Sequence, residues 1–139
     1  MTRILKTSGF LGLAVMMLVG LHQFGLLSGG QAPPGWMIGA HAHLGVLSIL
    51  AIVTGFAVES LALAGRLRTA VTGLFLTGQW LLPTTIWLGE GAGFTALLPT
   101  ILLWGVALVA SMLLMAWAAW TRSATPGVGP GSGPAVADD

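Results

Sequence analysis

Hydrophobic residues fall into four long stretches of the chain, separated by short segments rich in glycine, proline and charged residues. The stretches run from Ser8 to Leu27, from Gly35 to Val58, from Leu67 to Leu88 and from Phe94 to Thr121. Each is as long as the ~20 residues that a helix needs to cross the hydrocarbon core of a bilayer. The pattern therefore predicts four membrane-spanning helices within one domain, residues 1–122.

The connections between these stretches are short: SGGQAPP, ESLALAGR and GEGAG. Short loops make consecutive helices run antiparallel, and in lipid a helix must satisfy its own backbone hydrogen bonds. We therefore expect an all-α fold, an integral membrane four-helix bundle with antiparallel neighbours. Pro83 and Pro99 are expected to interrupt helical hydrogen bonding near one end of the bundle.

Composition points to lipid as the solvent. Of the 139 residues, 55% are hydrophobic and 6% are charged, and the mean hydropathy is +0.93. About a quarter of the residues of a soluble domain are charged. The absence of cysteine excludes disulfides, thiolate metal sites and cysteine nucleophiles. The net charge of +1 predicts no nucleic-acid partner.

The positive charges lie on one side of the predicted bundle. All five Lys and Arg residues flank the same set of helix ends: Arg3, Lys6, Arg66, Arg68 and Arg122. The positive-inside rule makes that side cytoplasmic. We expect a multi-pass protein of the cell (plasma) membrane with both termini in the cytoplasm. Residues 123–139, rich in Gly and Pro, are predicted to form a disordered cytoplasmic tail.

Three histidines lie within the apolar stretches. His22 precedes the end of the first stretch and His41 follows the start of the second, so both lie roughly 8–9 Å inside the same boundary. His43 belongs to the same layer, as do three residues of the third stretch: Thr84, Thr85 and Trp87. Ionisable groups in a span are costly and so are candidates for function. The alternative is that neutral histidines only hold helices together through hydrogen bonds.

The spacing of the histidines limits the cofactors that they can bind. Residues two apart on a helix project about 200° from each other, whereas chelation of one metal ion favours residues four apart. Zinc needs three or four ligands, and only Glu59 and Glu90, both at membrane boundaries, could add to the histidines. Haem needs one or two imidazoles and an apolar slot. The sequence has no C-x-x-C-H motif, so any haem would be non-covalent haem b. One histidine of the second stretch could bind it at a seam between subunits, while the other histidine of that stretch faces its own bundle.

Short motifs are spread over most of the chain. They are GW followed by AH in the second stretch, RL before the third, GQW within it, and ALLPTILLWGVAL in the fourth. Together they resemble the styrene-oxide isomerase family of small four-helix membrane proteins, which is related more distantly to hydroxylaminobenzene mutases. Members of that family overlay on His41 and Trp80 without a gap.

The resemblance implies haem b bound between the protomers of a homotrimer, with His41 as the axial ligand of the iron. His43, His22 and Trp80 complete the candidate cofactor site, and His41 (through the iron) and His43 are the candidate catalytic residues. The ferric iron would act as a Lewis acid that converts a small apolar epoxide into an aldehyde. The family's asparagine and tyrosine fall on Leu47 and Ile86, so the polar groups that orient the epoxide are missing. Other polar side chains could shape a different pocket: Ser48, Gln79, Thr84 and Thr85.

Three functions remain open from the sequence. The first is a haem b membrane enzyme of the isomerase type. The second is a membrane b-type cytochrome for electron transfer or small-gas sensing, without isomerase activity. The third is a non-catalytic membrane scaffold or assembly subunit in which the histidines only pack.

Overall fold

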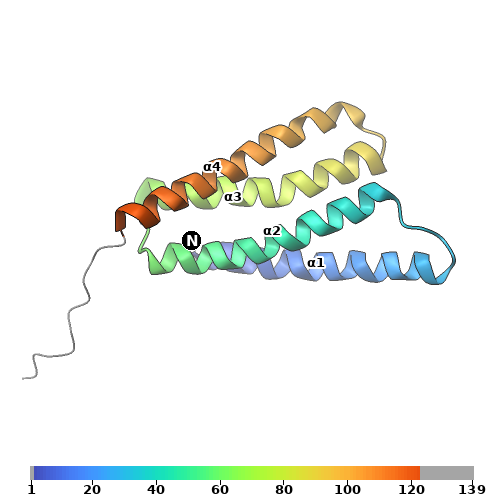
Figure 1. Cartoon of the computed structure of the whole chain (residues 1–139), viewed down its shortest axis with the longest axis horizontal. Coiled ribbons are helices and arrows are strands. Elements are labelled where there is room, and N and C mark those ends of the chain that lie inside the picture. Colours follow the sequence, from blue (N-terminus) through green and yellow to red (C-terminus); the bar gives the residue numbers. More distant parts are fainter. Residues whose placement is uncertain (1, 123–139) are drawn as a thin grey trace, which may run out of the picture.

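A computed structural model describes residues 2–122 (Figure 1). Four long helices follow one another: α1 (Thr2–Ser28), α2 (Gly35–Ser60), α3 (Gly65–Ile86) and α4 (Ile101–Arg122). A π-helix, η1 (Trp87–Gly91), and a 3-10 helix, η2 (Thr95–Thr100), join α3 to α4. The prediction of an all-α fold with four long helices is confirmed. The predicted tail, residues 123–139, lies outside the described residues.

The helix boundaries differ most from the predicted ones at the starts of α1 and α4, since α4 begins at Ile101, seven residues after the predicted start at Phe94. α1 begins at Thr2, six residues before the predicted start at Ser8, because the polar first turns are helical although they interrupt the apolar pattern. α3 continues through Pro83 to Ile86 before the backbone changes to the π-helix, so Pro83 is tolerated inside the helix although it cannot donate a backbone hydrogen bond. Pro99 lies in the 3-10 helix that precedes α4, as expected for a residue that lacks the backbone N–H.

Three helices are long and apolar enough to cross a membrane: Arg3–Ser28, Gly35–Ser60 and Thr95–Arg122. α3 does not meet the same standard, since Gln79, two arginines and several threonines and glycines lower its hydropathy. Three of the four predicted spans are therefore helices that could cross a membrane by length and composition. A crossing by α3 is supported only by its position between α2 and α4.

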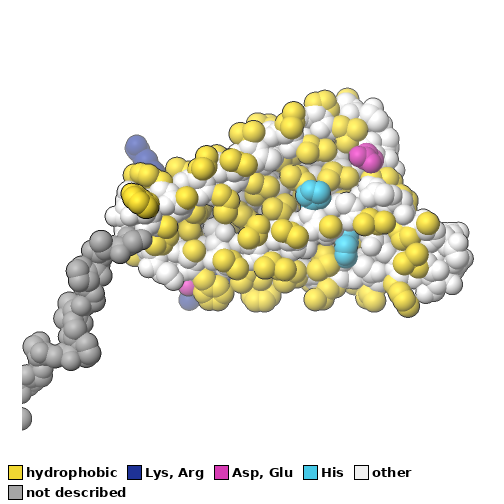
Figure 2. All heavy atoms as spheres, in the orientation of Figure 1, with side chains coloured by type: hydrophobic (Ala, Val, Ile, Leu, Met, Phe, Trp, Pro, Cys, Tyr) yellow, Lys and Arg dark blue, Asp and Glu magenta, His cyan; other side chains and the backbone are white. Residues whose placement is uncertain are grey.

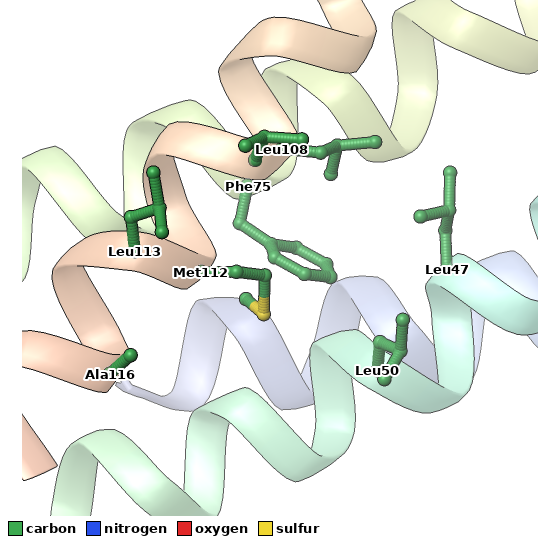
Figure 3. A pocket seen from close by; sticks show the side chains of 8 residues that line it. Leu47, Leu50, Phe75, Leu108, Met112, Leu113 and Ala116 are labelled. Carbon is green, nitrogen blue, oxygen red and sulfur yellow. The ribbon is translucent and has the colours of Figure 1, made fainter.

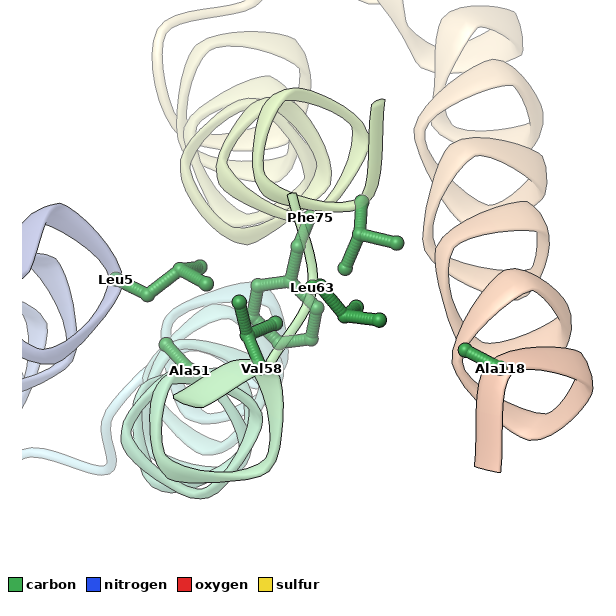
Figure 4. Packing of buried hydrophobic residues seen from close by; sticks show 7 residues of the cluster. Leu5, Ala51, Val58, Leu63, Phe75 and Ala118 are labelled. Carbon is green, nitrogen blue, oxygen red and sulfur yellow. The ribbon is translucent and has the colours of Figure 1, made fainter. Parts of the chain in front are cut away.

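The helices form two antiparallel hairpins, α1 with α2 and α3 with α4, which meet through α2 and α3. Figure 4 shows α1 and α4 on opposite sides of the α2–α3 pair. The hairpins diverge toward the α1–α2 and α3–α4 connections (Figure 1). The buried hydrophobic cluster lies toward the other end, where they converge: Leu5, Ala51, Val58, Leu63, Val71, Phe75 and Ala118.

Side chains on the outside of the bundle are mostly apolar, as lipid requires. On the face drawn in Figure 2, yellow side chains are spread along the helices between white areas, and the Lys and Arg side chains in view lie at the converging end. At that end Lys6 Nζ donates to Glu59 Oε2 at 2.5 Å. Arg122 Nη1 donates to the carbonyl oxygens of Leu61 and Ala62, each at 3.0 Å. These contacts join α1 to α2, and α4 to the connection that follows α2.

Glycines allow α1 and α2 to approach closely. A Cβ at Gly9 would lie 2.6 Å from the carbonyl oxygen of Ser48 and 2.5 Å from Ile52 Cγ1. At Gly20 it would lie 3.1 Å from Cε1 of His41. Such close backbone contact is how helices associate in lipid, where no hydrophobic driving force between them exists. The seam fixes the rotation of α2 and thereby decides which histidine faces α1.

Candidate functional site

His41 faces the interior of its own hairpin. Its ring lies against α1 at Gly20, and the side chain is half-buried. The Nδ1 atom is buried and has no hydrogen-bond partner. A buried polar atom without a partner costs free energy, so Nδ1 of His41 does not join α1 to α2 through a hydrogen bond.

His43 faces outward from the same helix. Its side chain is exposed, and Nδ1 lies 2.7 Å from the carbonyl oxygen of Gly39. A carbonyl oxygen can only accept, so Nδ1 carries the hydrogen and Nε2 keeps a free lone pair. This arrangement prepares an imidazole as a metal ligand, because the hydrogen bond fixes both the tautomer and the ring orientation.

The surface around His43 is apolar. His43 lines a groove of about 300 Å³ with Ala42, Val46 and Leu47, which we call the His43 groove. Leu47 also lines a second groove of about 380 Å³ between α2, α3 and α4, called the α2/α4 groove (Figure 3). Its lining is Leu47, Leu50, Phe75, Leu108, Val109, Met112, Leu113 and Ala116. His43, Leu47 and Leu50 share one face of α2 by their spacing, so His43 lies at one end of a long apolar face.

His22 does not join this face. It is exposed on α1, two residues beyond the glycine that contacts His41, which is a rise of about 3 Å. The three histidines therefore lie at similar depth, in agreement with the predicted layer, but their rings do not converge. Within residues 2–122 no three His, Asp or Glu side chains are grouped closely enough to hold a metal ion.

A buried polar network links the first three helices. Gln79 is 0% exposed; its Oε1 accepts from Ser8 Oγ at 2.9 Å. Its Nε2 donates to the Ser8 carbonyl oxygen at 3.2 Å and to Ser48 Oγ at 3.3 Å. Sequence reasoning placed Ser48 and Gln79 in a possible pocket, whereas they bond to each other, and it did not single out Ser8. The signal available was an amide in the middle of an apolar stretch, which needs partners when it is buried.

Trp80 belongs to a different part of the surface from His43. Its Nε1 donates to Ser8 Oγ at 2.7 Å. It lines a groove of about 320 Å³ with Val15, Val19, Leu44, Pro83, Thr84, Trp87 and Leu88. The two predicted cofactor residues Trp80 and His43 therefore line separate grooves.

Of the remaining predicted pocket residues, Thr85 and Trp87 contact other side chains of the bundle, and Thr84 lines a groove. Thr85 is buried and accepts a hydrogen bond from Trp104 Nε1 at 3.0 Å, which joins α3 to α4. Trp87 stacks edge-on against Trp36, with ring centroids 5.0 Å apart. Among these residues only Thr84 presents an exposed hydroxyl to a groove.

The residues around His43 fit one half of a haem site. They offer a single imidazole nitrogen and an apolar wall, which is the chemistry that haem b requires of a protein. Each described groove is open on one side, so a porphyrin at His43 would need a second surface to cover its other face. Leu47 lies beside His43, and no carboxylate or hydroxyl lines either of the two α2 grooves.

Comparison with known proteins assigns the chain to a family. No curated protein and no solved structure matches it. A family model described as "Domain of unknown function (DUF8059)" matches residues 1–139. The chain, over its whole length, therefore belongs to that family.

Proposed function

We propose that this protein binds haem b in a membrane, through an imidazole of α2 at a seam between copies of the chain. The observation that carries the proposal is the hydrogen bond from His43 Nδ1 to the Gly39 carbonyl oxygen. It leaves the Nε2 lone pair of an exposed imidazole beside an apolar wall. Neither zinc nor another ion that needs three ligands is supported by the described residues.

The geometry favours His43 over His41 as the axial ligand. The resemblance to styrene-oxide isomerases assigns the axial role to His41, but that ring lies between α1 and α2, against Gly20. Its Nδ1 is buried and the side chain is half-buried, so the ring is less accessible to a porphyrin than that of His43. His43 is accessible from outside the bundle without any movement of the helices.

We propose that a second copy of the chain covers the face of the haem that points away from His43. The homotrimer implied by the resemblance would supply it, and the apolar α2/α4 groove next to His43 is a surface that a neighbouring copy can bury. When bound in the ferric state, haem would supply an electrophilic iron, a Lewis acid. The chain itself contributes the imidazole, an apolar wall and the exclusion of water.

Isomerisation of an aryl epoxide to an aldehyde is the first activity to assay. It follows from the resemblance alone, and the apolar residues at positions 47 and 86 give the substrate no hydrogen bond. Electron transfer or gas sensing is favoured instead if the iron has two imidazole ligands. His22 is the second candidate ligand, since it is exposed at similar depth on α1.

We propose that the protein lies in the plasma membrane and crosses it four times. Both termini would then be in the cytoplasm. α2 and α4 can each cross the membrane, and α3 runs between them as the antiparallel partner of both. A crossing α3 would therefore be shielded from lipid on two sides. The Lys and Arg residues at the converging end support the orientation.

Absorption spectra of single-histidine variants test the proposal. We expect wild-type protein, purified in detergent from cells supplied with ample haem, to show a Soret band. His43→Ala should lose most of this band per mole of protein, because the iron loses its protein ligand. His41→Ala and His22→Ala should keep most of it.

The variants also separate the alternatives. Loss of the band in His41→Ala with retention in His43→Ala would contradict His43 as the axial ligand and support the assignment that the resemblance implies. The absence of a Soret band from haem-loaded wild type would contradict haem binding altogether and favour a scaffold. A high-spin ferric spectrum would favour an open iron site, and a low-spin one two imidazole ligands.

A further inference from the structure

A fourth groove lies near the start of α1. α1 and α3 contact each other at few positions, and between them the surface is hollowed by about 360 Å³. The groove is lined by Arg3, Ile4, Thr7, Ser8, Leu11 and Trp80, and we call it the N-terminal groove. It shares Trp80 with the groove that Thr84 lines, and it shares no residue with the His43 groove or the α2/α4 groove.

The N-terminal groove has a cationic mouth and an apolar floor. Arg3 and Thr7 are exposed, whereas Ile4, Leu11 and the Trp80 indole supply the apolar walls. The indole is held in place, since its Nε1 donates to Ser8 Oγ at 2.7 Å and Ser8 in turn donates to buried Gln79. The indole is therefore held in position before any ligand binds.

Arg3 is available to an anion. Among residues 2–122 the recorded salt bridge at this end joins Lys6 to Glu59, and Arg122 donates to two backbone carbonyl oxygens. No acidic residue lines the N-terminal groove. A guanidinium at a membrane boundary pairs well with phosphate, which it can bind through two parallel hydrogen bonds.

The dimensions match one lipid chain. The rise along α1 from Arg3 to Leu11 is about 12 Å, and one leaflet contributes about half of the ~30 Å hydrocarbon core. An acyl chain whose phosphate lies at Arg3 would therefore reach the level of Trp80. Basic pockets between helices at the cytoplasmic side are typical sites for anionic head groups.

From this charge pattern and these dimensions, we propose that the N-terminal groove binds one anionic phospholipid. Arg3 and Thr7 hold the phosphate, and one acyl chain lies against Ile4, Leu11 and Trp80. The inference is independent of haem, because the groove shares no residue with the surface around His43. Its role is to fix the α1–α2 hairpin beside α3 in the membrane.

Lipid binding to the purified full-length protein tests this proposal. Native mass spectrometry in neutral detergent compares phosphatidylglycerol with phosphatidylcholine of the same acyl chains. We expect wild type to prefer phosphatidylglycerol, and Arg3→Gln to weaken its binding about five-fold, the effect of one Arg at a membrane surface. Arg66→Gln is the matched control, since Arg66 is exposed at the same end but does not line the N-terminal groove. It should bind as wild type does.

A second variant tests whether an acyl chain occupies the N-terminal groove. Leu11 is 57% exposed, so Leu11→Trp should fold, as checked by circular dichroism, yet fill the groove and reduce binding of both lipids. Equal binding of the two lipids by wild type would overturn the proposal. So would an equal loss in Arg3→Gln and Arg66→Gln, which would indicate general attraction to a basic surface. Full competition by inorganic phosphate would show that the anion alone binds, and would overturn the lipid as occupant.

Discussion

Gly9→Ala is expected to destabilise the protein by about 2 kcal/mol, as overpacking of a close contact does. The added Cβ would lie 2.6 Å from the Ser48 carbonyl oxygen and 3.1 Å from the Ile52 backbone nitrogen. Neither backbone atom can turn away as a side chain can, so α1 must separate from α2. The measurement is the free energy of unfolding of the purified protein, from a denaturant titration followed by circular dichroism.

Gly25→Ala is the matched control for this substitution. It lies on the same helix, and a Cβ at that position would meet nothing within 4 Å. Alanine has a higher helix propensity than glycine by up to ~1 kcal/mol, so Gly25→Ala should be neutral or stabilising. Equal effects of the two substitutions would mean that the seam between α1 and α2 is not as close as described.

The four helices could be predicted from the sequence, because lipid imposes long apolar stretches and short loops impose antiparallel pairs. The extent of each helix was less predictable. The first turns of α1 contain Arg3, Lys6 and Thr7 and so interrupt the apolar pattern, but an exposed helix end tolerates polar residues. For α3, the low hydropathy argues against a membrane span, whereas its position between α2 and α4 favours one. Its buried amide, Gln79, lowers the hydropathy but finds its hydrogen-bond partners within the bundle.

The candidate site was predictable only in part, and the reason is geometric. A separation of two residues dictates that His41 and His43 point in opposite directions, but it does not dictate which one faces α1. That choice depends on the rotation of α2, which is set by contacts such as Gly20 with His41 and Gly9 with Ser48. These pairs are far apart in the sequence, and no local pattern indicates them.

The polar network escaped prediction for a similar reason. Ser8 and Gln79 are 71 positions apart, and a serine at a predicted helix boundary has no special signal. An unpaired amide in lipid is costly, so Gln79 alone indicated that some partner exists. The partner became evident only once α1 and α3 were placed side by side.

Gln79→Leu is the second substitution from which we expect a large effect. It removes hydrogen bonds to Ser8 and Ser48, and interhelical hydrogen bonds in membranes contribute on average ~0.6 kcal/mol each. With the buried Ser48 hydroxyl left unpaired, we expect a loss of about 2 kcal/mol in the free energy of unfolding. Since α1 and α3 make few other contacts, the contact between α1 and α3 should be the first to open, while α1 stays packed on α2.

A double-mutant cycle with Ser48→Ala tests whether the hydrogen bond itself is responsible. Ser48→Ala alone leaves Gln79 Nε2 a second acceptor, the Ser8 carbonyl oxygen, so its effect should be smaller than that of Gln79→Leu. In the double variant neither partner is left unpaired, and the combined loss should fall short of the sum by ~0.6 kcal/mol or more. Strict additivity would mean that Gln79 and Ser48 do not interact, and that Gln79 stabilises the bundle by its shape alone.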